Sequence, residues 1–150
     1  MNIPLPPDDA RRRDWMAILA KAPPARLAAL MPDLPAHDLL RPPQIGTVMV
    51  QGRTGGTGAP FNLGEMTVTR ASVRLGTGEV GHAMVQGRDK GHAARAAITD
   101  ALMQGDAAAR IEAEILDPLR REAEARRRTR AAKAAATRVE FFTLVRGEDQ

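Results

Sequence analysis

The spacing of apolar positions divides the chain into a helical N-terminal part, a β-rich middle and a helical C-terminal part. In the first part, apolar residues recur at i, i+3 and i+4, as in an amphipathic helix: Trp15, Ile18 and Leu19. We expect this helix to follow a cap at Asp8 or Asp9 and a disordered or extended lead over residues 1–8. A second, short helix is predicted over residues 26–30. Trp15 is expected to be a core anchor, with a surface docking role as the alternative.

The middle of the chain shows the two-residue alternation and the β-branched content of strands. Residues 45–51 are rich in β-branched side chains, and residues 70–75 alternate between polar and apolar types. The Gly-Thr-Gly sequence at residues 76–78 marks a tight turn, after which residues 80–85 return as the partner strand. The pattern therefore predicts an antiparallel meander.

Two arginines, Arg70 and Arg74, share one face of this predicted meander. A solvated face is the simpler interpretation, because half-polar strands normally have one wet side. Contact with acidic groups or phosphate on a neighbouring subunit is the alternative. The apolar residues of this strand lie at odd-numbered positions from 71 to 75, but upstream they lie at the even-numbered Met66 and Val68. This shift in the alternation predicts a β-bulge near Thr69.

Helical spacing returns after the meander. An apolar stripe predicts a helix from Asp89, its cap, to Met103. Residues 105–136 are expected to form an Arg- and Ala-rich helical segment. Large apolar residues recur every four positions in its first half: Ile111, Ile115 and Leu119. Its second half has only Ala to bury, so we expect it to be solvated or held by a partner.

Residues 137–147 are predicted to form a final strand with apolar residues on both faces. Alternation assigns one face to the chain's own core, with Val139, Phe141 and Val145. The other face is expected to meet a partner, with Phe142 and Leu144 at its centre and Arg138 and Arg146 at its rim. The expected fold class is α+β, with an N-terminal helical segment, an antiparallel meander, two or three helices and this strand, all in a single domain over residues 1–150.

Composition narrows the function classes. Aromatic residues make up only 3% of the 150 residues, so the core must be built from aliphatic side chains, and such a thin core suggests burial against a partner. The net charge is +4 and is carried mainly by Arg, which either serves to bind carboxylates and phosphates or reflects a GC-rich genome. A nucleic-acid binder ranks last, since there is no Tyr and few aromatic side chains for base stacking.

Catalytic and metal-binding patterns are not recognisable in the sequence. The absence of cysteine excludes disulfides, a thiolate nucleophile and a Cys-ligated iron–sulfur cluster in this chain. His37, His82 and His92 have neither metal-ligand spacing nor the partners of a Ser-His-Asp triad. No apolar run approaches membrane-spanning length and the first residues do not form a signal peptide, so a cytoplasmic protein without membrane contact is expected.

Two stretches are candidate phosphate-binding sites. The first is a glycine-rich loop whose backbone N–H groups suit a phosphate, although hairpin turns more often have such sequences. The second lies at the start of a predicted helix, where the helix dipole favours anions, although Asp89 occupies the cap. The candidate residues are Arg53, Gly55, Gly56 and Gly58 in the first stretch, and Arg88, Lys90 and His92 in the second.

Two stretches combine Gly, Arg and apolar residues densely: MVQGRDKGH at residues 84–92 and TRVEFFTLVRG at 137–147. Two shorter stretches accompany them: GGTG at residues 55–58 and DALMQ at 100–104. In order and approximate spacing the four stretches resemble the PhnG family, the G subunit of the bacterial carbon–phosphorus lyase core complex, also described as a subunit of alpha-D-ribose 1-methylphosphonate 5-triphosphate synthase. The resemblance runs from about Trp15 to Gly147.

The resemblance implies a non-catalytic or accessory subunit in organic phosphonate catabolism. In that family the G subunit acts with the H and I subunits and an ATPase-like L subunit to replace the adenine of ATP with an alkylphosphonate. A J subunit, with an iron–sulfur cluster and S-adenosylmethionine, later breaks the C–P bond, so no cofactor is expected here. The implied partners are the H, I and J subunits, I most directly, and the ATPase-like K and L subunits. The alternative is a phosphate- or nucleotide-binding module that contacts substrate through residues 53–58 or 88–92.

Overall fold

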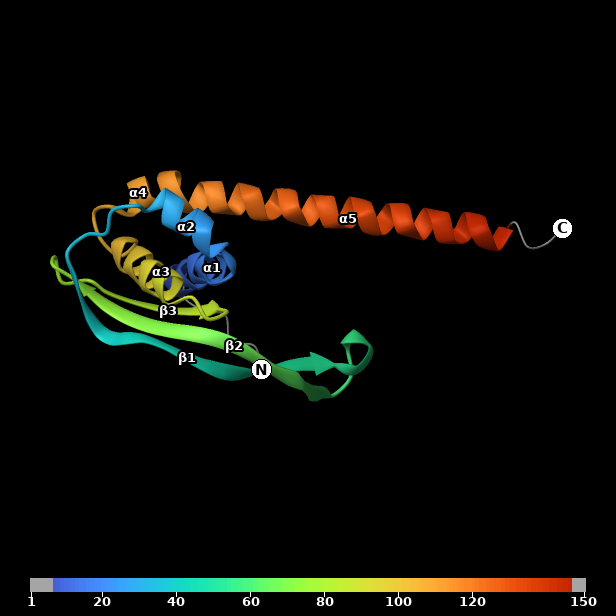
Figure 1. Ribbon diagram of the computed structural model, residues 1–150, viewed down its shortest axis with the longest axis horizontal. Coiled ribbons are helices and arrows are strands. Elements are labelled where there is room, and N and C mark those ends of the chain that lie inside the picture. Colours follow the sequence, from blue (N-terminus) through green and yellow to red (C-terminus); the bar gives the residue numbers. More distant parts are fainter. Residues whose placement is uncertain (1–6, 147–150) are drawn as a thin grey trace.

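A three-stranded antiparallel sheet in the order β1-β2-β3 forms the base of the molecule (Figure 1). The computed structural model describes the backbone of residues 7–146 and the side chains of residues 8–138. Helix α3 packs on one face of the sheet, α1 lies beside α3 and β3, and the remaining helices lie above them. The elements are α1 (Pro7–Lys21), α2 (Pro24–Leu30), β1 (His37–Arg53), η1 (Thr54–Gly56), β2 (Pro60–Leu75), β3 (Val80–Gln86), α3 (Lys90–Leu102), α4 (Ala108–Ile111), the π-helical turn η2 (Glu112–Leu116) and α5 (Asp117–Arg146).

The predicted α+β class and antiparallel meander are confirmed, but the first two strands are much longer than the short runs expected. The bulge predicted near Thr69 is not in β2, which pairs with β3 in unbroken register there; the nearest irregularity lies in the partner strand β1, opposite residues 70–72. Val68 and Thr69 are consecutive buried residues, so the change of parity does not mark a residue inserted in β2. One of the register shifts lies in β1 between Arg41 and Gln44, where two prolines lack the N–H groups needed for the ladder.

The two N-terminal helices are confirmed, with one correction at their start. Helix α1 begins at Pro7, so the lead predicted for residues 1–8 is wrong for Pro7 and Asp8, and residues 1–6 lie outside the described part. Proline is favoured in the first turn of a helix, and the acidic Asp8 and Asp9 suit its positive end. Trp15 is 8% exposed, which confirms it as a core residue.

Small residues let α3 pack very close to the sheet. The helix buries four alanines: Ala93, Ala96, Ala97 and Ala101. Ala97 and Ala101 lie against β3 at Gly81, where an added Cβ would be only 1.9 Å from the Ala97 carbonyl oxygen. The helix also begins as predicted, because the Asp89 side chain accepts a hydrogen bond from the His92 N–H. Close approach of backbones therefore substitutes for the bulky aromatic side chains that the core lacks.

The strand predicted over residues 137–147 is wrong, since the backbone of α5 remains helical to Arg146. No Gly or Pro interrupts the chain between Pro118 and Gly147, and the Ala- and Arg-rich sequence propagates the helix into the apolar run. A short apolar run does not distinguish strand from helix by its period alone. The proposed partner-side residues Phe142, Leu144 and Arg146 have side chains outside the described set.

Candidate functional site

The glycine-rich candidate forms the tip of the β1–β2 hairpin. Gly55 and Gly56 have φ values of 61° and 82°, which residues with a side chain rarely adopt. The Gly58 N–H donates to the Thr54 carbonyl at 2.9 Å, and Arg53 Nη1 donates to the Gly58 carbonyl at 3.4 Å. These contacts are those of a closed turn, and phosphate binding by this loop stays a prediction.

The residues of the second phosphate-binding candidate lie in two different environments. Arg88 and Lys90 are exposed at the start of α3, whereas His92 is only 2% exposed and faces the core. His92 Nε2 lies 2.8 Å from the Leu19 carbonyl oxygen and therefore carries the proton, while Nδ1 has no partner among the described residues. Anion binding at this helix start stays a prediction for Arg88 and Lys90, with Asp89 holding the cap.

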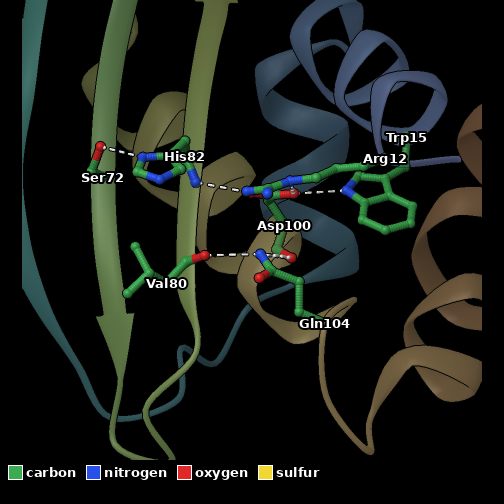
Figure 2. Close-up of polar contacts among 7 residues, drawn as sticks. All are labelled: Arg12, Trp15, Ser72, Val80, His82, Asp100 and Gln104. Atoms are coloured by element: carbon green, nitrogen blue, oxygen red, sulfur yellow. Dashed lines mark hydrogen bonds and ion pairs between the residues drawn. The ribbon is translucent and has the colours of Figure 1, made fainter. Parts of the chain in front are cut away.

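A buried carboxylate, Asp100 of α3, joins three elements of the fold (Figure 2). Its Oδ1 accepts hydrogen bonds from Trp15 Nε1 at 2.8 Å and Arg12 Nε at 3.2 Å. Its Oδ2 accepts from Arg12 Nη2 at 2.8 Å and from the His82 backbone N–H at 2.9 Å. The hydrogen bond with Asp100 is the main cause that raises the pKa of Arg12 above its ordinary value. Because each oxygen has two donors, the carboxylate is fully satisfied without water.

The side chains of Asp100 in α3 and of Gln104, just after the end of α3, also satisfy part of the free edge of β3. In an antiparallel ladder, alternate residues point their N–H and C=O groups away from the paired strand. At this edge the His82 N–H donates to Asp100, and Gln104 Nε2 donates to the Val80 carbonyl at 2.8 Å (Figure 2). The sequence analysis placed residues 100–104 only at the end of a predicted helix and in the family resemblance, and it gave Asp100 and Gln104 no polar role. The sequence signal that could have indicated this role is an acid and an amide, Asp100 and Gln104, four positions apart at the end of an apolar helix face.

An exposed polar pair on the sheet, Ser72 and His82, has no carboxylate bound to the histidine ring as a Ser-His-Asp triad would, among the described residues. Ser72 Oγ lies 2.8 Å from His82 Nδ1 across neighbouring strands, and both side chains are solvent-accessible (Figure 2). The nearby Asp100 binds the His82 backbone rather than its ring, so the pair is a cross-strand contact. Within the described part of the chain, no group of three His, Asp or Glu residues is placed to hold a metal ion. None of the described helices is long and apolar enough to span a membrane.

The outer part of the β1–β2 hairpin is a two-stranded arm, residues 47–67. It has two strands because β3 pairs with β2 only over residues 68–74, and it projects beyond α1, α2 and α3 (Figure 1). Isolated two-stranded hairpins are marginal in water, and clustered exposed apolar side chains mark interaction surfaces. The large exposed side chains of the hairpin arm are Met49 at 62%, Phe61 at 45% and Leu63 at 62%. The sequence pattern had placed the partner-facing surface in residues 137–147 instead.

A second projection is α5, which extends from the same end of the helical body as the hairpin arm (Figure 1). Its 30 residues correspond to a length of about 45 Å. Leu119 is buried in the core, but every residue from Glu124 to Arg138 is exposed. Arg138, an interface candidate from the sequence, therefore lies on an open surface.

Comparison of the sequence with known protein families identifies the relatives of this chain. Residues 10–147 match the family described as phosphonate metabolism protein PhnG. The chain belongs to the PhnG family. It is 49% identical over 144 residues to the alpha-D-ribose 1-methylphosphonate 5-triphosphate synthase subunit PhnG of Rhizobium meliloti (strain 1021), covering 93% of this chain and 92% of that protein. The family inferred from four short stretches is thereby confirmed, and the PhnG match spans both the hairpin arm and the Asp100 cluster.

Proposed function

We propose that this chain is an accessory subunit of a cytoplasmic multisubunit transferase that acts in organic phosphonate catabolism. The family and the name of the Rhizobium meliloti relative support the role as a subunit of such a synthase. The observation that carries the accessory role is the hairpin arm, which presents Met49, Phe61 and Leu63 to solvent beyond the core. An exposed apolar surface of this kind is suited to contact with another subunit.

The proposed reaction of the assembled enzyme exchanges the adenine of ATP for an alkylphosphonate. A C–O bond from ribose to the phosphonate replaces the C–N bond to adenine, and adenine leaves. The reacting groups are proposed to lie in an I-type subunit, the most direct partner, acting with H- and L-type subunits. The J- and K-type subunits are proposed as further members of the complex. The iron–sulfur cluster and S-adenosylmethionine of the later C–P cleavage are assigned to the J-type subunit, in keeping with a sequence that has no cysteine.

The hairpin arm can be tested by co-purification with the I-type subunit. We expect the combined change Met49→Ser, Phe61→Ser and Leu63→Ser to abolish co-purification while the melting temperature of the isolated chain stays nearly constant, since these side chains are already exposed. The matched control replaces Leu34 and Leu40, which are 41% and 46% exposed outside the arm, by Ser. Full co-purification of the arm variant would contradict the proposed role of this surface.

Catalysis is tested separately by adenine release. The isolated chain, incubated with ATP and methylphosphonate, is expected to release no adenine, whereas the co-purified subunits release it. Adenine release by the isolated chain, reproduced with independently purified material, would place reacting groups in this subunit. That result would overturn the accessory role but not membership of the family.

A further inference from the structure

The free edge of β3 is only half covered. Asp100 and Gln104 bind the outward groups of His82 and Val80, as described above. Because β3 pairs with β2 in unbroken register, the same alternation points the N–H and C=O of Met84 and the N–H of Gln86 toward this edge. Among the described residues, none of these three outward groups has a hydrogen-bond partner. The open half of the edge thus has a regular row of backbone donors and acceptors.

Helix α1 runs along this open half and leaves a groove between itself and β3. The groove has a volume of about 410 Å³. Its walls are mainly apolar and small, and its charged residues come from α1. The lining includes Met16, Ala17 and Ala20 of α1, Ala96 of α3, Met84 of β3 and the charged Arg13. Arg13 is exposed and forms no ion pair among the described residues.

We propose that an extended segment of a partner subunit binds in this groove as a fourth strand beside β3. Backbone groups that alternate along an edge are matched by the backbone of another strand, the mode of recognition called β-augmentation. A helix has its own backbone groups paired internally and cannot satisfy such a row. The proposal rests on the proposed function, which supplies the partner subunit.

The walls of the groove define the chemistry of the bound segment. A strand about 4.8 Å from β3 directs alternate side chains toward the core-side wall. Small apolar residues suit those positions, because Ala17, Ala20 and Ala96 leave space there. An acidic side chain suits the position nearest Arg13. A second copy of this chain fits less well, since its own β3 edge is flanked by its own α1.

The test changes one backbone N–H and compares two substitutions at the same position. Met84→Pro removes the outward N–H without removing a hydrogen bond to β2, a position where an edge strand tolerates proline. Met84→Ala removes the side chain and keeps the N–H. We expect Met84→Pro to bind the I-type subunit about tenfold or more weakly than Met84→Ala, because both variants lose the side chain and only Met84→Pro also loses the outward N–H. Equal binding by both variants would overturn the proposal.

Amide hydrogen exchange on the wild-type chain decides the matter even if Met84→Pro fails to fold. We expect exchange at Met84 and Gln86 to slow on binding the I-type subunit, and unchanged exchange would overturn the proposal. Two results with the free chain would also overturn the proposal. Slow amide exchange at Met84 and Gln86 that becomes fast when residues 1–6 are deleted would show that the chain's own N-terminal residues occupy the groove. Exchange that slows as the protein concentration rises would show that a second copy of the chain occupies it. Failure of the wild-type chain to co-purify with any subunit would instead contradict the proposed function.

Discussion

Replacing Asp100 by Ala is expected to lower the free energy of unfolding by about 4 kcal/mol. The change leaves the Trp15 indole N–H and the His82 backbone N–H without their acceptor, and an unsatisfied buried donor costs about 1–3 kcal/mol. The ion pair with Arg12 adds no more than about 1 kcal/mol, because that side chain is 35% exposed and screened by water. Two donors at about 1.5 kcal/mol each, together with the ion pair, account for the total.

The assay is urea unfolding followed by the fluorescence of Trp15, the single tryptophan of the chain. Asp100→Asn keeps the shape but replaces one acceptor oxygen by a donor, so about half of the loss is expected. The control is Asp106→Ala, an exposed acidic position near the end of the same helix, which should change stability by less than about 0.5 kcal/mol. An Asp100→Ala loss below about 1 kcal/mol with an unchanged urea dependence would show that water replaces the carboxylate, and the reasoning would then be wrong.

Two further predictions concern packing and surface charge. Gly81→Ala should lower the free energy of unfolding by about 3 kcal/mol, because the added Cβ would lie 1.9 Å from the Ala97 carbonyl oxygen. The control Gly46→Ala should be nearly neutral, since an added Cβ there has nothing within 4 Å. Similar melting temperatures for the two variants in thermal unfolding would refute the close approach of α3 to the sheet. Arg26→Ala removes an exposed ion pair of 2.8 Å to Glu122 and should cost less than about 1 kcal/mol, with the difference shrinking in high salt. A larger, salt-independent loss would point to packing of the arginine stem instead.

The elements that the sequence predicts well are those with local signals. The spacing around Trp15, the Asp89 cap and the Gly-Thr-Gly turn each lie within a few residues of the structure they specify, and α1, α3 and the β2–β3 turn are found there. The cap is direct, since a carboxylate three residues before an amide needs no distant partner to bind it.

The features that the sequence did not predict depend on residues far apart in the chain, or on apolar spacings that fit both a helix and a strand. The role of Asp100 requires Arg12, 88 positions away, which no local pattern reveals. The C-terminal apolar run alternates like a strand, but the helix that precedes it continues through it. The parity change at Val68 comes from two consecutive buried residues, Val68 and Thr69, which a single strand pattern does not distinguish from a bulge. The hairpin arm depends on where β3 stops pairing, and this is decided by tertiary structure.

The outer length of α5 has a consequence for how the chain melts. Nucleating a helix is the unfavourable step, and here the folded body performs it once, at the buried turn around Leu119. Residues 124–138 then extend the helix on the propensity of Ala and Arg alone, because their exposed side chains gain nothing from the core. Their helicity is expected to decline gradually on heating, while the core unfolds in one cooperative step. Circular dichroism and Trp15 fluorescence will therefore trace different transitions in one chain.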